Sequence, residues 1–304
     1  MTGGLGLIGS ETVLQLQNLY GARNVYSTDL GKRRTTSYTK DATYQSDVSK
    51  SSFSDLLTEL SPTIIVHAAA HPGGRSLQEP SLNVETNALG SMRVFEWCAK
   101  NDCKILYLSS SIVYGDVLPV PITEDRLPNP GTIYGVSKLA CEQWLKILEV
   151  GYDLDWSVIR PFSTYGFGHV PSLDQGIVNV MLTQIDSGGP VVVKGSLERQ
   201  RDLVHVSDAA RAICCAIERW SSRRIINVCT GISTSILEIL HLIATERGIR
   251  FENLEIQEEV GTVGDPMYNV GDPRLARELI KFEAKTSVKE GIAQLISQRL
   301  RVRA

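Results

Sequence analysis

Tyr134, Lys138 and Ser110 are the residues whose types and spacing best fit acid–base chemistry. Tyr134 and Lys138 are four positions apart, and Ser110 ends an apolar run upstream. Residues four apart share one face of a helix, so the phenol and the ammonium are expected to point into the same space. A nearby cation lowers the pKa of a phenol, and a shift of about 3 units from a value near ~10 would make Tyr134 a proton acceptor for an alcohol. The same spacing is also common on surface helices that do no chemistry.

A run of glycines at the start of the chain favours the chemical interpretation. Gly3, Gly6 and Gly9 recur at every third position, and an amphipathic run follows through Leu19. Glycine permits a tight turn and lets the backbone approach a pyrophosphate, while the helix that begins there directs free N–H groups at the phosphates. The pattern therefore predicts a dinucleotide-binding turn.

The segment 24–29 reads as a second strand that ends in an acid, Asp29. A carboxylate about 20 residues past such glycines can accept a hydrogen bond from the adenosine ribose 2′-hydroxyl. It would also repel a 2′-phosphate, so NAD is expected rather than NADP. The basic residues at positions 32–34 could hold that phosphate instead, and Asp29 could be a turn residue before Gly31.

The start of the chain lacks one expected element. A glycine fingerprint of this kind normally follows a buried strand, yet Met1 and Thr2 stand directly before Gly3. We therefore expect either a few more apolar residues in the true chain or a sheet without its first strand. The second case would leave backbone donors and acceptors of the neighbouring strands unpaired.

Composition narrows the classes of partner. The chain has 304 residues, 42% of them hydrophobic, and a formal net charge of −3. This charge does not suggest nucleic acid or an anionic membrane as a partner, and no apolar run reaches the ~18 residues needed to span a bilayer. The six cysteines form no Cys-x-x-Cys pair and the histidines lack metal-ligand spacing. We expect a cytoplasmic protein with reduced cysteines and no metal.

Strand-like and helix-like segments alternate through the first half of the chain. Continuous apolar runs at 63–70, 104–110 and 156–162 are typical of buried parallel strands, and 133–150 reads as a helix. Repeated β-α-β units predict an α/β fold, a Rossmann-like doubly wound parallel sheet whose ligands bind at the carboxyl ends of the strands.

The second half is more broken by glycine and proline. We predict an NAD-binding domain over 1–165 with its first strand missing. The remaining residues, 166–304, are predicted to form mainly a smaller C-terminal substrate-binding region, interleaved with the last part of the sheet.

Taken together, these motifs resemble the extended short-chain dehydrogenase/reductase family, the NAD-dependent nucleotide-sugar epimerases and dehydratases. The resemblance covers nearly the whole chain. It is carried by the glycine turn and Tyr134-x-x-x-Lys138, together with Ser46-Asp47-Val48, His67-Ala68-Ala69, Asn87-x-x-Gly90, Ser109-Ser110-Ser111, Arg160-Pro161-Phe162 and Arg201-Asp202-Leu203.

The resemblance implies a role for each matching residue. It makes Ser110, Tyr134 and Lys138 catalytic, and Tyr134 and Lys138 also contact the cofactor, NAD. The other residues that it assigns to NAD are Gly3, Gly6, Leu7, Ile8, Asp29, Asp47, Val48, Ala68, Ala69, Ala70, Asn87, Ser109 and Pro161. Those that it assigns to a nucleotide-diphosphate sugar are Ser111, Ser163, Arg201 and Asp265. From the residues alone, Asp47 could be a loop acid, and Arg201 could form a salt bridge to Asp202 or Asp208.

Departures from the family pattern narrow the reaction. Where dehydratases carry an acid pair and decarboxylases a glutamate, this chain has Ser111-Ile112, which disfavours elimination. Thr262 stands where many relatives place a diphosphate-binding arginine, and Ser163 replaces a common asparagine. We expect a 4-epimerase acting through a transient 4-keto sugar. The alternatives are an NAD(P)-dependent ketoreductase of the same family and a non-catalytic dinucleotide-binding protein.

Two further expectations concern the surface. The resemblance implies a homodimer built from two helices, and the apolar residues that could supply the faces are Val94, Phe95, Trp97, Trp144, Leu145, Ile147 and Leu148. His71 and His169 lie in loops near the expected substrate mouth, whereas His205 lies in an apolar strand and is expected to be structural.

Overall fold

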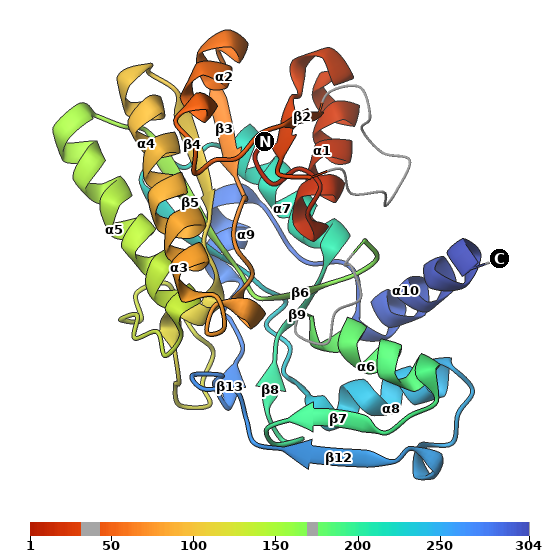
Figure 1. The fold of residues 1–304 in the computed structure, drawn as a ribbon. Coiled ribbons are helices and arrows are strands. Elements are labelled where there is room, and N and C mark those ends of the chain that lie inside the picture. The colour runs from red at the N-terminus through yellow and green to blue at the C-terminus, as the bar shows by residue number, and fades with distance from the viewer. Residues whose placement is uncertain (32–42, 169–175, 304) are drawn as a thin grey trace.

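A six-stranded parallel sheet forms the centre of the computed structural model, which describes residues 1–31, 43–168 and 176–303 (Figure 1). The basic residues at positions 32–34 and His169 lie outside the described residues. The strands follow one another across the sheet in the order β2 (Thr43–Gln45), β1 (Ser27–Asp29), β3 (Ile64–His67), β4 (Lys104–Leu108), β5 (Trp156–Pro161) and β10 (Arg224–Val228). The parallel sheet predicted from the apolar runs is confirmed.

The first two residues of the chain lie between β1 and β3. Thr2 forms parallel bridges to Thr28 and His67, and its N–H donates to the Val66 carbonyl at 3.0 Å. The carbonyl of Met1 accepts from the N–H of Thr28 at 2.8 Å. Met1 and Thr2 therefore occupy the sheet position between β1 and β3, directly before the glycine turn.

Helices cover both faces of the sheet because its strands alternate their side chains between two cores. On one face, Ile65, Ile105 and Val158 pack against α2 (Ser52–Leu60), α4 (Ser91–Lys100) and α5 (Ile133–Tyr152). On the other face, Val66 and Leu106 pack against α7 (Val206–Glu218) and α9 (Arg274–Ile280), with α1 (Leu7–Tyr20) lying along α7 (Figure 1). This is the doubly wound arrangement.

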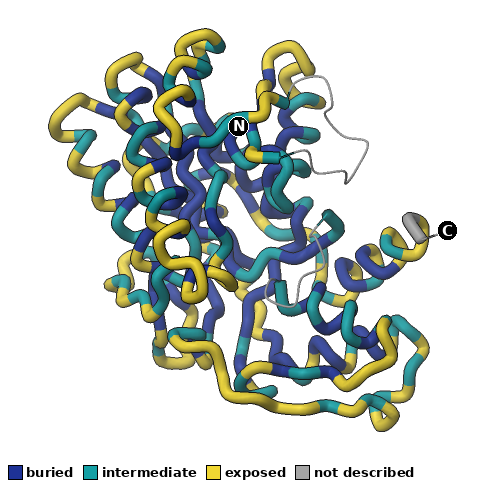
Figure 2. The backbone as a smooth tube through the Cα atoms, viewed as in Figure 1, coloured by how far each residue is buried: buried dark blue, intermediate teal, exposed yellow. Residues whose placement is uncertain are grey.

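A second hydrophobic core lies in the C-terminal half, below the sheet in Figure 1. It is formed by α6 (Ile177–Ser187), α8 (Ile236–Glu246), α10 (Val288–Arg303) and β7 (Val191–Lys194), which pairs with β12 (Ile256–Glu259). Figure 2 shows buried backbone in both regions. Because β10, α7 and α9 return to the first region, the two are interleaved; a division near residue 165 stays a prediction.

Short elements connect the two regions and border the site. β6 (Ser163–Tyr165) pairs with β9 (Leu203–His205), and β8 (Gln200–Arg201) pairs with both β11 (Thr234–Ser235) and β13 (Tyr268–Asn269). α3 (Pro80–Asn83) continues through a π-helical turn, Val84–Gly90, into α4. Single 3-10 turns lie at Ala22–Asn24, Gly73–Arg75, Ser111–Tyr114 and Phe251–Asn253.

The prediction of which side chains form a dimer face is partly wrong. Val94, Phe95, Trp97 and Leu145 are buried in the core of their own chain, so they cannot meet a partner. Ile147 is 66% exposed and remains available. Among the described residues, no helix is both long and apolar enough to cross a membrane.

Candidate active site

The glycine turn before α1 is closely packed. The backbone of Gly3 has a positive φ of 67°, and a Cβ atom on Gly9 would lie 1.9 Å from the Gly3 carbonyl oxygen. Only glycine fits at these two positions, because any side chain would push the turn open. The predicted turn is therefore present, and the amino end of α1 opens directly into the adjoining cavities.

Asp29 lies at the end of β1 and faces one of these cavities, which has a volume of about 320 Å³. Its Oδ2 accepts a hydrogen bond from the N–H of Leu5 at 3.0 Å, which orients the carboxylate. The same cavity is lined by Val48 and by the three residues that follow β3, Ala68, Ala69 and Ala70. The structure thus brings Asp29, Val48 and the three alanines, all predicted to bind NAD, to one cavity.

A hydroxyl behind this cavity holds the Ala68–Ala69 backbone in place. Thr2 Oγ1 accepts hydrogen bonds from the N–H groups of Ala68 and Ala69 at 3.2 and 3.1 Å. It lies 2.7 Å from Nδ1 of the fully buried His67, whose Nε2 lies 2.9 Å from the Ser91 hydroxyl. Because Thr2 already accepts twice, its proton goes to His67 Nδ1, and the imidazole is neutral with its own proton on Nε2.

Two residues assigned to the cofactor do not line either cavity. Asp47 Oδ1 accepts from the N–H of Ser49 at 2.8 Å, as in the loop-acid alternative. Asn87 is buried, where its amide bonds both backbone groups of His71 at 2.6 and 3.1 Å. Asn87 therefore shapes the loop after β3 from behind, and only His71 faces the cavity.

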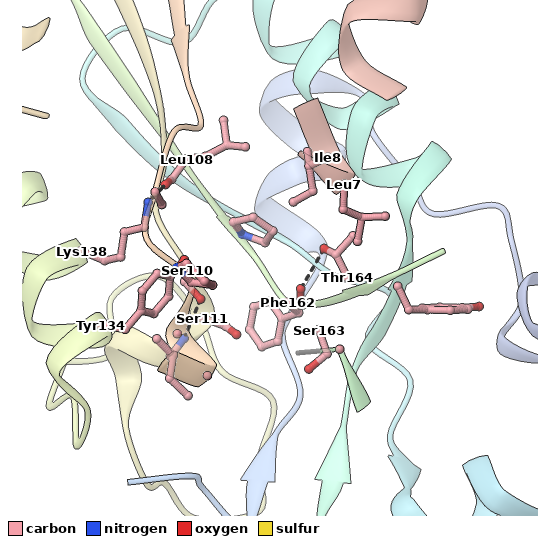
Figure 3. Close-up of a pocket in the computed structure, with 18 of the residues that line it drawn as sticks. Leu7, Ile8, Leu108, Ser110, Ser111, Tyr134, Lys138, Phe162, Ser163 and Thr164 are labelled. Atoms are coloured by element: carbon pink, nitrogen blue, oxygen red, sulfur yellow. Dashed lines mark hydrogen bonds between the residues drawn. The ribbon is translucent and has the colours of Figure 1, made fainter. Parts of the chain in front are cut away.

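Ser110, Tyr134 and Lys138, the trio predicted to be catalytic, line a larger cavity, of about 580 Å³, next to the first. In Figure 3, Tyr134, Lys138 and Ser110 lie on one side of it, with Leu7 and Ile8 opposite. Thr132 begins α5 by accepting a hydrogen bond from the N–H of Gly135 at 2.9 Å, which fixes the direction in which Tyr134 leaves the helix. The shared helix face predicted from the spacing is confirmed.

The effect of Lys138 on Tyr134 differs from the expectation. Nζ of Lys138 donates to the Leu108 carbonyl at 2.6 Å and lies 5.6 Å from the centroid of the Tyr134 ring. Burial raises the pKa of Tyr134 to about 12, which is opposite to the direction expected from a neighbouring lysine. Burial also lowers the pKa of Lys138 to about 8.

The residues predicted to bind substrate line the far part of the same cavity. Ser111, Ser163, Arg201 and Asp265 all face it, as do Pro161 and the backbone of Ser109. Asp265 Oδ1 accepts from Arg201 at 2.7 Å, and its Oδ2 pairs with Arg199. The expected alternatives for Arg201 are therefore wrong: Asp202 bonds the 230–231 loop and Asp208 pairs with Arg211.

Two arginines share one carboxylate at this wall, which leaves a net positive charge there. Both guanidinium groups are largely buried, at 6% and 7% side-chain exposure for Arg199 and Arg201. Burial lowers the pKa of Arg201, while the charge of Asp265 opposes the shift. A ligand with more than one negative charge would stabilise such a wall, and a diphosphate is such a ligand.

His205 is accounted for by local packing. His205 caps the first turn of α7 through Ser207, and its ring meets Tyr165 edge-on, as expected for a structural residue. Within the described residues, no group of three or more His, Cys, Asp or Glu side chains could hold a metal ion.

The comparisons with known proteins agree with this geometry. A model of the NAD dependent epimerase/dehydratase family matches residues 1–229. The chain belongs to this family. A putative UDP-glucose 4-epimerase of Methanocaldococcus jannaschii is 26% identical, over 98% of this chain and 96% of that protein.

Solved structures of the same family superimpose closely. A Thermus thermophilus UDP-glucose 4-epimerase complex with NAD has a TM-score of 0.87 at 28% identity, covering 97% of this chain and 96% of that one. MoeE5 in complex with UDP-glucuronic acid and NAD has a TM-score of 0.89 at 28% identity, covering 99% and 98%.

NAD is the cofactor of this family, and the residues present fit it. The closely packed Gly3–Gly9 turn leads into the amino end of α1, which borders the cavity and whose free N–H groups would bind a pyrophosphate. Asp29 offers a carboxylate at the ribose end, and the two adjoining cavities share lining residues from the glycine turn to Ala70. NAD held in this way would direct its nicotinamide end towards Tyr134 and Lys138.

Sequence analysis missed Glu142, Arg160 and Arg199 as parts of the site. Arg160 was read only as part of a family motif, yet it pairs with Glu142 directly behind Ser109. The signal for Glu142 was its spacing, since it follows Lys138 by four residues as Lys138 follows Tyr134. No comparable signal marked Arg199, whose partner Asp265 is 66 positions away.

Proposed function

We propose that the protein is an NAD-dependent 4-epimerase of a nucleotide-diphosphate sugar, with UDP as the nucleotide. One observation carries the proposal: the Ser110–Tyr134–Lys138 trio shares a cavity with both the glycine turn and the paired arginine wall at Arg201. A sugar held at its diphosphate by that wall would present its ring to the trio. The named relatives that act on UDP-sugars support the choice of nucleotide.

Each group of the trio has a task in moving one proton. Tyr134, once ionised, accepts the proton of the C4 hydroxyl, and Ser110 hydrogen-bonds the same oxygen and relays the proton. Lys138 supplies the positive charge that stabilises the phenolate. NAD, when bound, would supply the acceptor and donor of hydride. The 4-keto sugar must then turn over within the cavity before it is reduced on its other face.

The cavity lacks the acid that elimination would need. Among the described lining residues, Asp265 is the only carboxylate, and it is occupied by Arg199 and Arg201. Ser111, which stands where dehydratases carry an acid, accepts from the Asn269 amide at 3.0 Å. Loss of a sugar hydroxyl as water would therefore lack a second acid, whereas epimerisation needs no acid beyond the trio, because the proton taken up by Tyr134 returns to the C4 oxygen.

The test uses the purified protein without added cofactor. It is incubated separately with UDP-glucose, UDP-glucuronic acid and UDP-N-acetylglucosamine, and the C4 epimer is followed by proton NMR. With substrate deuterated at C4, the product should keep the label, because the same hydrogen returns to C4. A reaction that proceeds only with stoichiometric reduced cofactor would identify a ketoreductase instead. If heating the protein releases no NAD and no UDP-sugar is turned over, the alternative of a non-catalytic dinucleotide-binding protein is favoured.

We also propose a homodimer formed through α5 and the segment before α4. The apolar residues exposed there are Leu82, Val84 and Leu89, together with Val136, Ile147 and Val150 of α5. Val150 is 88% exposed, and contact with a second copy of the chain would remove this apolar side chain from water. Light scattering on an Ile147→Asp variant tests the interface, and a wild-type monomer at micromolar concentration would contradict it. Six free cysteine thiols, five of them buried, are compatible with the proposed cytoplasmic location.

A further inference from the structure

A buried ion pair stands directly behind the catalytic trio. Glu142 of α5 and Arg160 of β5 are 0% and 2% exposed. Arg160 donates from Nε to Oε1 of Glu142 at 2.9 Å and from its terminal nitrogen to Oε2 at 2.5 Å. A buried ion pair contributes little net stability to a fold, because hydrophobic residues of the same volume often stabilise it equally well. Its retention at this place invites a functional explanation.

The Glu142 carboxylate has a third partner. Its Oε1 accepts from the hydroxyl of Ser109 at 2.5 Å, so this side chain points at α5 while Ser109 contributes its backbone to the cavity. One turn earlier on the same helix, Lys138 donates to the carbonyl of Leu108 at 2.6 Å. Two side chains of α5 thus hold two consecutive residues at the end of β4, immediately before Ser110.

The backbone of Ser110 shows why the hydrogen bonds to Leu108 and Ser109 matter. Its φ and ψ are −162° and 151°, and the backbone pairing of β4 with β5 ends one residue before it, at the hydrogen bond from the Ser109 N–H to the Ile159 carbonyl at 2.8 Å. Among the described residues, the Ser110 hydroxyl accepts from one group, the N–H of Ile112, at 3.3 Å. Its position relative to Tyr134 therefore depends on where Leu108 and Ser109 are anchored.

We infer that Glu142 is a positioning residue of the active site, which anchors Ser109 so that Ser110 faces Tyr134 and which places a negative charge one helical turn from Lys138. This inference rests on the proposed function for its kinetic consequences. It assigns a task to a residue that touches neither cofactor nor substrate. The Lys138–Glu142 spacing puts both side chains on the face that carries Tyr134.

The charges around Lys138 support the electrostatic part of this role. Cys141 and Glu142 of α5 are its titratable neighbours on the same helix. The centroid of the Tyr107 ring in β4 lies 4.8 Å from Nζ of Lys138, and His67 of β3 is neutral. Tyr134 is the remaining titratable neighbour. Burial lowers the pKa of Lys138 to about 8, and Cys141 and Glu142 oppose that shift.

Arg160 of β5 is the cation that pairs with Glu142. Burial alone would lower the pKa of Arg160, but its hydrogen bonds to Glu142 and the Glu142 charge raise it overall. The cation therefore stays charged and holds the carboxylate in place. Since Cys141 is a neutral thiol whose pKa burial raises further, Glu142 is the anion that acts on Lys138 at neutral pH.

The experiment separates the anchoring from the charge with two variants. Ser109→Ala removes the hydrogen bond and leaves the charge of Glu142 intact, whereas Glu142→Gln keeps the shape and removes the charge. Glu149→Gln is the matched control: it lies on the same helix and accepts from Trp156 at 2.9 Å, away from the cavity. For each variant, kcat is measured from pH 6 to 10, with folding checked by circular dichroism.

A second readout does not depend on turnover. With lysine labelled at its ε-carbon, the NMR resonance of Lys138 is assigned by its loss in Lys138→Met and then titrated in the wild type and in each variant. This measurement reports the Glu142 effect even if the wild type epimerises no nucleotide sugar. Failure of the proposed function and failure of this inference are therefore distinguishable.

We expect Ser109→Ala to lower kcat about tenfold or more, with the alkaline limb of the pH profile unmoved. Glu142→Gln should lower kcat and move both that limb and the Lys138 titration down by about one pH unit, because the anion that favours the ammonium is gone. Glu149→Gln should match the wild type in both. A Ser109→Ala enzyme with wild-type kcat would overturn the anchoring, even if Glu142→Gln does not fold. A folded Glu142→Gln protein with the wild-type Lys138 titration would overturn the charge role.

Discussion

The ammonium of Lys138 lies 5.6 Å from the centroid of the Tyr134 ring and is held there by the Leu108 carbonyl. Lys138 is therefore a fixed charge near the phenol rather than its hydrogen-bond partner. Since burial raises the pKa of Tyr134 to about 12, this shift favours the neutral phenol at neutral pH. Lys138 is the cation placed to oppose that effect.

Replacing Tyr134 with Phe should abolish epimerisation without removing NAD. The loss of a general base costs about 10²–10⁴-fold in rate, whereas the glycine turn and Asp29 remain in place to bind NAD. Turnover and the NAD released on heating are measured for the wild type and for Tyr134→Phe. Turnover at the wild-type rate would show that another group accepts the proton.

Replacing Gly9 with Ala should abolish NAD binding and lower stability. The added Cβ would lie 1.9 Å from the Gly3 carbonyl oxygen, so the turn must open to admit it. Gly151→Ala is a matched control, because its Cβ meets nothing within 4 Å and the position is helical. The control should keep NAD and gain up to about 1 kcal/mol in the free energy of unfolding. Equal NAD content in both variants would contradict the role of the turn.

The choice of cofactor should depend on the charge of Asp29. Its carboxylate faces the adenosine cavity and is oriented by the Leu5 N–H. Asp29→Asn keeps an acceptor for that N–H and removes the charge that repels a 2′-phosphate. The ratio of NADP to NAD dissociation constants, measured by calorimetry, should fall at least tenfold in the variant. An unchanged ratio would mean that the carboxylate does not face the ribose.

The alternating pattern of the chain was sufficient to predict the sheet, because each buried strand needed a continuous apolar run to pack on both faces. The Tyr134–Lys138 helix face was predictable for a similar reason, since helical geometry is local. Contacts set by tertiary packing were not: Arg199 and Asp265 are joined across 66 residues, and Asn87 turned inward to His71. The direction of the Tyr134 pKa shift depended on burial, which spacing does not report.

Stability should fall on mild acidification because of His67. Burial lowers the pKa of this imidazole to about 3, while in the unfolded chain it is near ~6.5. Between these values only the unfolded state binds the proton, so the free energy of unfolding falls by about 1.4 kcal/mol for each pH unit below ~6.5. Denaturant unfolding of the wild type and His67→Asn is compared at pH 7.5 and 5.5. The difference between the two pH values should be about 1.4 kcal/mol smaller in the variant, and equal differences would refute the neutral buried imidazole.

Substrate affinity should depend on Arg201 more than on Arg199, although both pair with Asp265. Arg201 faces the cavity, and a lost charge-assisted hydrogen bond to phosphate costs about 1.5–3 kcal/mol, or roughly 10–100-fold in KM. Arg199 does not line the cavity, so Arg199→Gln removes the same charge without a direct contact. We expect Arg201→Gln to raise KM for the UDP-sugar with little change in kcat, and Arg199→Gln to raise it less. Equal increases in both variants would place the effect in the Asp265 loop rather than in a direct Arg201–phosphate contact.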